Sequence, residues 1–402
     1  MKDVLIIGAG PAGLFAAENL SAKGFSVSIA DRMPSPARKF LMAGRGGLNL
    51  THGEDLQTFL KRYREAEPFL APMIRAFPPE ALRDWCHGLG EQTFVGSSGR
   101  VFPVSMKASP LLRAWLRRLE DNKVQLLSRH TWRGLAEDGS ALLEDGAGEV
   151  EPFPARAVLL ALGGASWPKL GSDAAWVPLL EAKDIEVHRF QPANCGFQVA
   201  WSAHLKDRFA GKPLKRIVLS HAGRRVSGEA LLSAQGLEGG GIYALSAELR
   251  ETINQNGKAE LSIDLRPSLT MEELTKKLQK PRKKQSQATF LKKTLKLKPE
   301  ELTLLREAGE LPSDPDDLAR RIKAVAICLT APYAIGRAIS SAGGIAVTEL
   351  DDHLMLKKQP GLFAAGEMLD WEAPTGGYLL QACFATGHCA AAGIETYLSE
   401  GQ

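Results

Sequence analysis

The stretch VLIIGAGPAG (residues 4–13) is the most informative part of this 402-residue chain about its fold. Its first four residues are apolar and predict a short buried strand, and LFAAENLSAKG (14–24) predicts a helix that follows the glycines directly. SVSIADR (26–32) predicts a second strand that ends near Asp31. A strand, a glycine turn, a helix and a further strand in this order predict a β-α-β unit.

The three glycines of this turn have different physical tasks. Gly8 permits the tight turn, Gly10 lets a pyrophosphate approach the backbone, and Gly13 lets the helix pack closely on the strand. The helix N-terminus offers free N–H groups to the anion. Asp31 follows at about the 20-residue distance of an acid that accepts hydrogen bonds from a ribose 2′-hydroxyl, and it disfavours a 2′-phosphate there. The pattern predicts dinucleotide binding.

The C-terminal segment GLFAAGEMLDWEAPTGGYLLQA (361–382) indicates which dinucleotide is bound. It predicts a strand, the pair Gly366-Glu367, a loop, and a second helix that begins after Gly377. Flavoproteins of the two-dinucleotide-binding type end in this way: the acid holds the ribityl or pyrophosphate region, and the helix N-terminus faces the flavin. ALGG (161–164) is a third feature expected of that fold. We therefore expect FAD rather than NAD, bound non-covalently.

The stretch ARKFLMAGRGGLNLTH (37–52) places Arg38, Lys39 and Arg45 among glycines soon after Asp31. Basic side chains and exposed N–H groups suit a pyrophosphate or the flavin edge. A basic surface loop is the alternative interpretation.

These segments occur in an order that is typical of a known family. Three further segments fit the same order: GRVFPVSMKASPLLRAWLRRL (99–119), ALGGASWPKLGSDAAW (161–176) and AGGIAVTEL (342–350). Over nearly its full length the chain resembles the BaiN/YhiN-type NAD(P)/FAD-dependent oxidoreductases, and residues 99–119 are similar to an uncharacterised flavoprotein subgroup. Carried onto matching positions, the resemblance implies FAD contacts from Gly8, Gly10, Gly13, Asp31, Arg38, Lys39, Gly46, Asn49, Gly366, Glu367, Gly377 and Tyr378. Pro11, Ala12, Arg32, Arg45 and Gly163 complete the predicted cofactor site.

The resemblance implies an α/β fold with a discontinuous, Rossmann-like FAD domain, interrupted by a β-rich and a helical domain. Composition places the FAD domain at 1–192 and 326–402 and the β-rich, substrate-side domain at 193–266. The helical domain covers 267–325, where Thr270 and Glu273 form a capping box and Pro299 opens a helix. A further helix is expected to start at Asp316 or Asp317 and to run through DLARRIKAVAICL (317–329).

Two departures from the family pattern limit what its activities imply. Leu48 replaces the cysteine of a GGGRCN-like stretch, and SAQGLEGGG (233–241) lacks the histidine of a THxGLSGP-like segment. The family includes reductases of conjugated C=C bonds, ribosomal RNA dihydrouridine synthases and small-amine oxidases. Membership therefore predicts the cofactor better than the substrate.

We predict an FAD-dependent oxidoreductase that transfers hydride through flavin N5, acts on a small molecule and is reduced by NAD(P)H. No second GxGxxG is present, so a nicotinamide would bind only transiently. Alternatives are a dihydrouridine synthase acting on ribosomal RNA, a small-amine oxidase, and a non-catalytic scaffold. Candidate proton donors are Tyr243, His221 and Glu372, with Cys195, Trp167 and Trp371 as further candidates; for each alone, a structural role is the stronger interpretation.

Charge and hydropathy indicate which partners the protein could bind and in which cell compartment we expect it. The net charge is only +4, but residues 276–298 hold ten Lys or Arg and no acid. Two interpretations of this segment are a solvated helix face and a contact with an RNA backbone. Phe290 is its lone aromatic residue. No run reaches the ~18 apolar residues of a membrane span, so we expect a cytoplasmic protein without a membrane contact. We expect no metal, because Cys383, His388 and Cys389 would point to different faces of the last helix.

Overall fold

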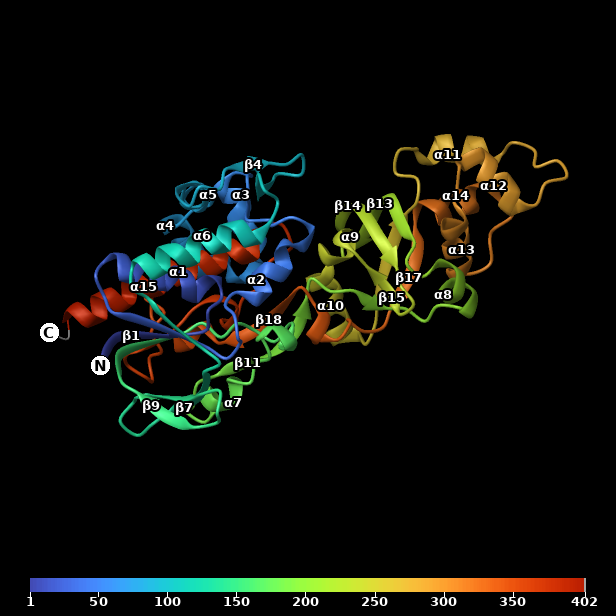
Figure 1. Ribbon diagram of the computed structural model, residues 1–402. Coiled ribbons are helices and arrows are strands. Elements are labelled where there is room, and N and C mark those ends of the chain that lie inside the picture. Colours follow the sequence, from blue (N-terminus) through green and yellow to red (C-terminus); the bar gives the residue numbers. More distant parts are fainter. Residues whose placement is uncertain (401–402) are drawn as a thin grey trace. The chain divides into compact units, whose positions relative to one another are not determined.

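The computed structural model describes residues 1–400, except for the side chain of Arg45. The chain forms two compact units. The first comprises Met1–Gln191 and the chain from Ser340 onward, and the second comprises Pro192–Ile339 (Figure 1).

A five-stranded parallel sheet forms the centre of the first unit. Its strand order is β19-β10-β1-β2-β6, and every neighbouring pair is parallel. The strands are β1 (Lys2–Ile7), β2 (Val27–Asp31), β6 (Gln125–Ser128), β10 (Ala155–Leu160) and β19 (Leu362–Ala364). The last four residues of β1 and of β10 are apolar and buried, because helices and loops cover both faces of such a sheet. The predicted α/β class with a Rossmann-like sheet is confirmed.

Three helices lie together on this sheet: α1 (Pro11–Ala22), α6 (Ala108–Asp121) and α15 (Tyr378–Glu400) (Figure 1). The contact between α1 and α15 is close, since a Cβ on Gly387 would lie 2.5 Å from the Ala12 carbonyl oxygen. Beside it, the buried rings of Phe15, Trp115 and Phe384 form an aromatic cluster with the partly buried Trp85. The small residues of the last helix thus bring the end of the chain onto the first helix.

Smaller elements complete the first unit. They are α2 (Arg38–Ala43), α3 (Leu56–Leu60), α4 (Glu67–Ala76), α5 (Pro79–Gly88), α7 (Val177–Glu181), the sheet of β3 (Thr51–His52), β4 (Thr93–Val95) and β5 (Arg100–Pro103), and the sheet of β7 (Thr131–Leu135), β8 (Ala141–Glu144) and β9 (Val150–Phe153). Strands β11 (Val187–Ala193) and β18 (Ser340–Ile345) pair next to the two points where the chain leaves and re-enters this unit.

The second unit contains an antiparallel sheet in the order β12-β15-β14-β13-β16-β17. Its strands are β12 (Phe197–Gln198), β13 (Pro213–His221), β14 (Arg224–Leu232), β15 (Gly236–Glu238), β16 (Ala259–Asp264) and β17 (Val325–Leu329). Its helices are α8 (Ala203–Phe209), α9 (Gly240–Tyr243), α10 (Ser246–Asn256), α11 (Met271–Leu278), α12 (Gln287–Leu295), α13 (Pro299–Glu307) and α14 (Pro315–Lys323). Helix and sheet residues share one core, so the β-rich segment and the helical segment form a single compact unit.

The prediction of one helix through residues 317–329 is wrong. Helix α14 is capped by Asp314 and ends at Lys323, and residues 325–329 form β17, which pairs with β16. Val325, Ile327 and Leu329 alternate with exposed residues, a period of two that suits an edge strand better than a helix. The chain consequently returns to the first unit at Ser340 rather than at 326. The predicted capping box of Thr270 and Glu273 is present at the start of α11.

We expect Gly387→Val to destabilise the protein by about 1–3 kcal/mol, because the added side chain collides with the backbone of α1. Urea unfolding of the purified protein measures this change. Ala392→Val is the matched control: it lies on an exposed position of the same helix and should cost roughly 0.5 kcal/mol from helix propensity alone. Equal losses for the two variants would contradict the close contact between α1 and α15.

Candidate cofactor site

The turn between β1 and α1 contains three glycines. The protein's own packing requires two of them to be glycine but does not require the third. A Cβ on Gly8 would lie 2.2 Å from the Ala161 oxygen, and a Cβ on Gly13 would lie 2.0 Å from the Gly8 oxygen. Gly10 has ordinary extended backbone angles, and a Cβ there would meet nothing within 4 Å. Its missing side chain keeps open the space in front of the helix N-terminus.

Asp31 ties the end of β2 to this turn. Its carboxylate accepts hydrogen bonds from the backbone N–H of Ala9 at 2.8 Å and of Met33 at 2.7 Å. Burial raises the pKa of Asp31, and the two N–H donors oppose the rise because they favour the charged form. Each carboxylate oxygen keeps a lone pair beyond these bonds, which leaves it able to accept from a ribose hydroxyl.

A cavity of 510 Å³ lies against the turn, within the first unit. Its volume falls in the range of sites for small molecules and cofactors. Besides β1, β2 and α1, its wall includes β7 and the segments 161–163 and 170–176. Eleven of the predicted cofactor residues line it: Gly8, Gly10, Pro11, Ala12, Asp31, Arg32, Arg38, Lys39, Gly163, Gly366 and Glu367.

Arg32 contributes an unsatisfied donor to the cavity wall. One of its terminal nitrogens forms a 2.6 Å ion pair with Asp173. Its Nε is buried and has no hydrogen-bond partner within residues 1–400. A buried donor without an acceptor is costly, so a ligand oxygen at this position would be stabilised.

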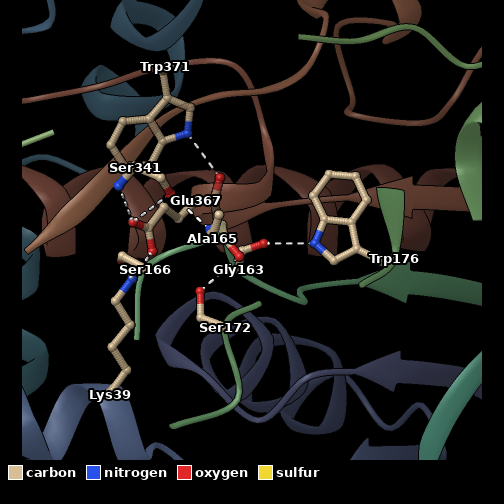
Figure 2. Close-up of polar contacts among 11 residues, drawn as sticks. Lys39, Gly163, Ala165, Ser166, Ser172, Trp176, Ser341, Glu367 and Trp371 are labelled. Atoms are coloured by element: carbon tan, nitrogen blue, oxygen red, sulfur yellow. Dashed lines mark hydrogen bonds and ion pairs between the residues drawn. The ribbon is translucent and has the colours of Figure 1, made fainter. Parts of the chain in front are cut away.

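Lys39, Glu367 and Ser341 form a polar network at the cavity edge (Figure 2). The Lys39 ammonium donates to Glu367 at 2.5 Å and to the Ser166 hydroxyl at 2.6 Å. Glu367 also accepts from the Ser341 N–H at 3.0 Å. Glu367 is therefore held by two segments distant in sequence, and it orients Lys39 toward the loop that follows β10.

That loop is held by side chains from three other positions (Figure 2). The Trp176 ring N–H donates to the Gly163 oxygen at 2.9 Å, and the Ser172 hydroxyl donates to the Gly164 oxygen at 2.9 Å. The Ala165 N–H donates to the Ser341 hydroxyl at 3.1 Å. Sequence reasoning missed Ser172, Trp176 and Ser341, and no local signal marks them, because each acts through tertiary contacts.

The remaining predicted cofactor residues do not line the cavity. Gly13 packs α1 onto the sheet, as described above, and the predicted contact of Arg45 concerns a side chain outside the described residues. Gly46 is exposed. Asn49 accepts from the Gly377 N–H at 3.2 Å when its amide is oriented to satisfy both of its ends. The Tyr378 hydroxyl donates to Glu54, so these residues anchor the start of α15 on the chain around β3.

Four of the six candidate proton donors have structural partners. Glu372 pairs with Arg64 at 3.7 Å, and the buried Trp371 donates to the Gly366 oxygen at 2.9 Å. Both His221 ring nitrogens are engaged, one by the Glu260 oxygen and the other by the Thr252 hydroxyl. Trp167 precedes a short 3-10 helix, and the buried Cys195 thiol contacts the Pro192 oxygen. Tyr243 is half-buried, and burial raises the pKa of its phenol.

Two further features bear on the chemistry of the site. Leu48, which replaces the family cysteine, is fully buried in the core of the first unit. Cys383 lines the cavity, and burial raises the pKa of its thiol to about 12, so it stays protonated and is a poor nucleophile. Across residues 1–400, no group of three or more His, Cys, Asp or Glu side chains could hold a metal ion, and none of the helices is long and apolar enough to cross a membrane.

The chain matches the family described as HI0933-like protein Rossmann domain over residues 2–393. It belongs to this family of flavoprotein oxidoreductases. The predicted resemblance to BaiN/YhiN-type proteins is thereby confirmed. Proteins of this family bind FAD. Three features of the site fit that cofactor: the cavity, the open space at Gly10 and the unsatisfied Arg32 donor.

Two curated proteins are similar over nearly their whole length. The 3-dehydro-bile acid delta(4,6)-reductase of Clostridium scindens is 27% identical, with 97% of this chain and 98% of that protein covered. The ribosomal RNA dihydrouridine synthase of Escherichia coli is 24% identical, with 94% of each covered.

Solved structures with the same fold are more distant in sequence. A 3-ketosteroid delta1-dehydrogenase from Sterolibacterium denitrificans has a TM-score of 0.54 at 14% identity, over 98% of this chain and 99% of that one. A flavocytochrome c3 fumarate reductase has a TM-score of 0.55 at 13% identity, over 99% of this chain and 78% of that one. At these identities the likeness concerns the fold.

We expect Gly10→Ala to fold normally and to lower FAD affinity at least tenfold, because the methyl group enters space that the protein leaves open for a pyrophosphate. Fluorescence titration of the apoprotein with FAD measures the affinity, and thermal unfolding of the apoprotein checks the fold. Gly88→Ala, at an exposed helical position, is the control. Undiminished FAD affinity in Gly10→Ala would contradict the site. Gly13 is a less sharp probe, since its substitution also disturbs packing.

Proposed function

We propose that the protein is an FAD-dependent reductase that NAD(P)H reduces and that then saturates an electron-poor C=C bond of a small molecule. The observation that carries the proposal is the cavity at the β1–α1 turn, with Gly10 open toward it and Asp31 in its wall. The names of both curated relatives describe saturation of a C=C bond, which favours a reductase over an oxidase. When bound, FAD supplies a two-electron carrier that takes up and releases hydride at N5.

The residues of the chain have separate tasks in this proposal. The N-terminus of α1 and the Arg32 Nε would hold the pyrophosphate, and Asp31 would accept from a ribose hydroxyl. Lys39, fixed by Glu367, would place a positive charge toward the rest of the cofactor. Within the described residues the glycine turn at 8–13 is the single motif of this type, so NAD(P)H would use the substrate position and leave before the substrate binds.

Anaerobic addition of NADH or NADPH to the purified protein should bleach the flavin band at about 450 nm, because the proposed donor delivers two electrons to the flavin. Adding 4-androstene-3,17-dione or uridine-containing RNA should then restore the band if either is an acceptor. If the flavin stays oxidised with both nicotinamides but is reduced by small amines, the protein is an amine oxidase and not the proposed reductase. A protein that binds no flavin would favour the scaffold.

Ribosomal RNA is a second candidate substrate, favoured by the basic segment 276–298. Nine of its ten cationic side chains are exposed: Lys276, Lys280, Arg282, Lys283, Lys284, Lys292, Lys293, Lys296 and Lys298. Of these, only Lys298 reaches a carboxylate within 4.0 Å in residues 1–400, at Glu300. A concentration of unpaired cations attracts a polyanion by counterion release.

The apolar faces of the same helices favour RNA over a lipid surface. Leu274 and Leu278 of α11, and Phe290 and Leu291 of α12, are buried in the core of the second unit. These faces are therefore not available to enter a bilayer. Because Phe290 is buried, base stacking by this segment is also excluded, and its contacts would be to phosphates.

Reversing three of these charges, Lys280→Glu, Lys284→Glu and Lys293→Glu together, should weaken binding to ribosomal RNA fragments at least tenfold. The slope of log affinity against log salt should fall by about 2–3. Filter binding over a salt series measures both. A variant with Lys61, Lys183 and Lys206 reversed has the same net charge and should lose much less. Equal losses, or no RNA binding by the unaltered protein, would remove the RNA candidate.

A further inference from the structure

Two consecutive glycines of β18 allow two segments distant in sequence to pack on that strand. A Cβ on Gly343 would lie 2.6 Å from the Arg189 oxygen of β11, which pairs with β18 (Figure 1). A Cβ on Gly344 would lie 2.4 Å from the Met368 oxygen. Both glycines also have a positive φ, a conformation that favours glycine. Strand β11 and the 366–371 segment therefore both contact the backbone of β18 directly.

This segment connects β18 and β11 to the cofactor cavity. Gly366 and Glu367 line the cavity. The Trp371 ring N–H donates to the Gly366 oxygen at 2.9 Å, so the end of the segment is tied to its start. Between them, the Asp370 N–H donates to the Ile345 oxygen of β18 at 2.9 Å. A displacement of Asp370 would consequently also displace the two residues that line the cavity.

His188 of β11 lies between two carboxylates, and both of its ring nitrogens are engaged. Its Nδ1 is 2.6 Å from an Asp370 oxygen, and its Nε2 is 3.3 Å from a Glu186 oxygen. An ionised carboxylate only accepts hydrogen bonds, so each contact requires an N–H on the ring. Neutral imidazole has one N–H, and imidazolium has two. The protonated ring therefore satisfies both contacts, whereas the neutral ring satisfies one.

The groups around the ring favour the protonated form. The hydrogen bond with Asp370 is the first cause that raises the pKa of His188, Glu186 adds to the rise, and partial burial opposes it. Strand alternation turns the side chain of Arg189 to the other face of β11. Strand β18 carries no titratable side chain in residues 340–345.

Two further acids in the neighbouring segments already have cationic partners. Glu367 pairs with Lys39 at 2.5 Å, and Glu349 pairs with Lys358 at 2.8 Å. Their negative charges are balanced, so the titration of the ring depends mainly on the two carboxylates that contact it.

We propose that His188 is a positioning residue of the cofactor site and that its protonated form strengthens FAD binding. The imidazolium holds Asp370, and through the 366–371 segment it keeps Gly366 and Glu367 in place before FAD binds. A preordered site binds more tightly, because less conformational freedom is lost on binding. The neutral ring keeps one carboxylate contact and holds the segment less firmly. The inference rests on FAD binding in this cavity and is independent of the proposed reductase activity.

FAD affinity should consequently fall as the pH rises. The pKa of His188 is raised above its ordinary value of about 6.5, so its contribution is complete below that pH and is lost as the pH rises through the folded-state pKa. Fluorescence titration of the apoprotein should show a loss of about twofold to fivefold between about pH 6 and about pH 9, the size expected of one exposed ion pair. His188→Gln should bind at the weaker level throughout. His188→Lys, which keeps its charge over this range, should bind at the tighter level throughout.

His353→Gln, which alters another exposed histidine of the first unit, is the matched control and should keep the pH profile of the unaltered protein. Thermal unfolding of each apoprotein separates a loss of stability from a loss of FAD affinity. An FAD affinity that does not change with pH, or a His188→Gln profile like that of the unaltered protein, would overturn the inference. A protein that binds no FAD at any pH would instead overturn the proposed function, so the two failures are distinguishable.

Discussion

The close backbone contact at the first turn is the constraint on which the rest of the first unit depends. Gly13 packs against the Gly8 oxygen, and Gly8 packs against the Ala161 oxygen, so β1, α1 and the end of β10 meet without intervening side chains. The same closeness extends to the C-terminal part, where Gly387 contacts the backbone of Ala12. Chain ends separated by more than three hundred residues thereby contribute to one cavity wall.

Two basic side chains in this cavity wall are each paired with a carboxylate, and hydrogen-bond donors remain available to an anion. Asp173 balances Arg32, and Glu367 balances Lys39, so neither basic side chain is buried with an uncompensated charge. The Arg32 Nε and the open space at Gly10 remain unused by the protein. The first N–H groups of a helix such as α1 have no partner within the helix. A site of this kind is preorganised for a phosphate-containing ligand, because its donors need no rearrangement on binding.

Local sequence patterns were sufficient for the parts of the structure that depend on short-range rules. The glycine turn, the acid that ends β2, and the C-terminal strand and helix follow from spacing and periodicity. The Ser341 contacts with Glu367 and Ala165 could not be predicted, because they join segments whose proximity only the folded chain establishes. Strand β17 was missed for a related reason: its five residues follow a strong amphipathic helix, and its partner β16 lies more than sixty residues earlier.

Whether the cavity beside Gly10 holds FAD can be measured from the absorption spectrum of the purified protein before and after acid precipitation. With FAD in this cavity, we expect a flavin band at about 450 nm. Acid should release its chromophore into the supernatant as FAD, in an amount equal to that of the protein. A protein that is colourless, and that stays colourless after incubation with excess FAD and gel filtration, would contradict this expectation.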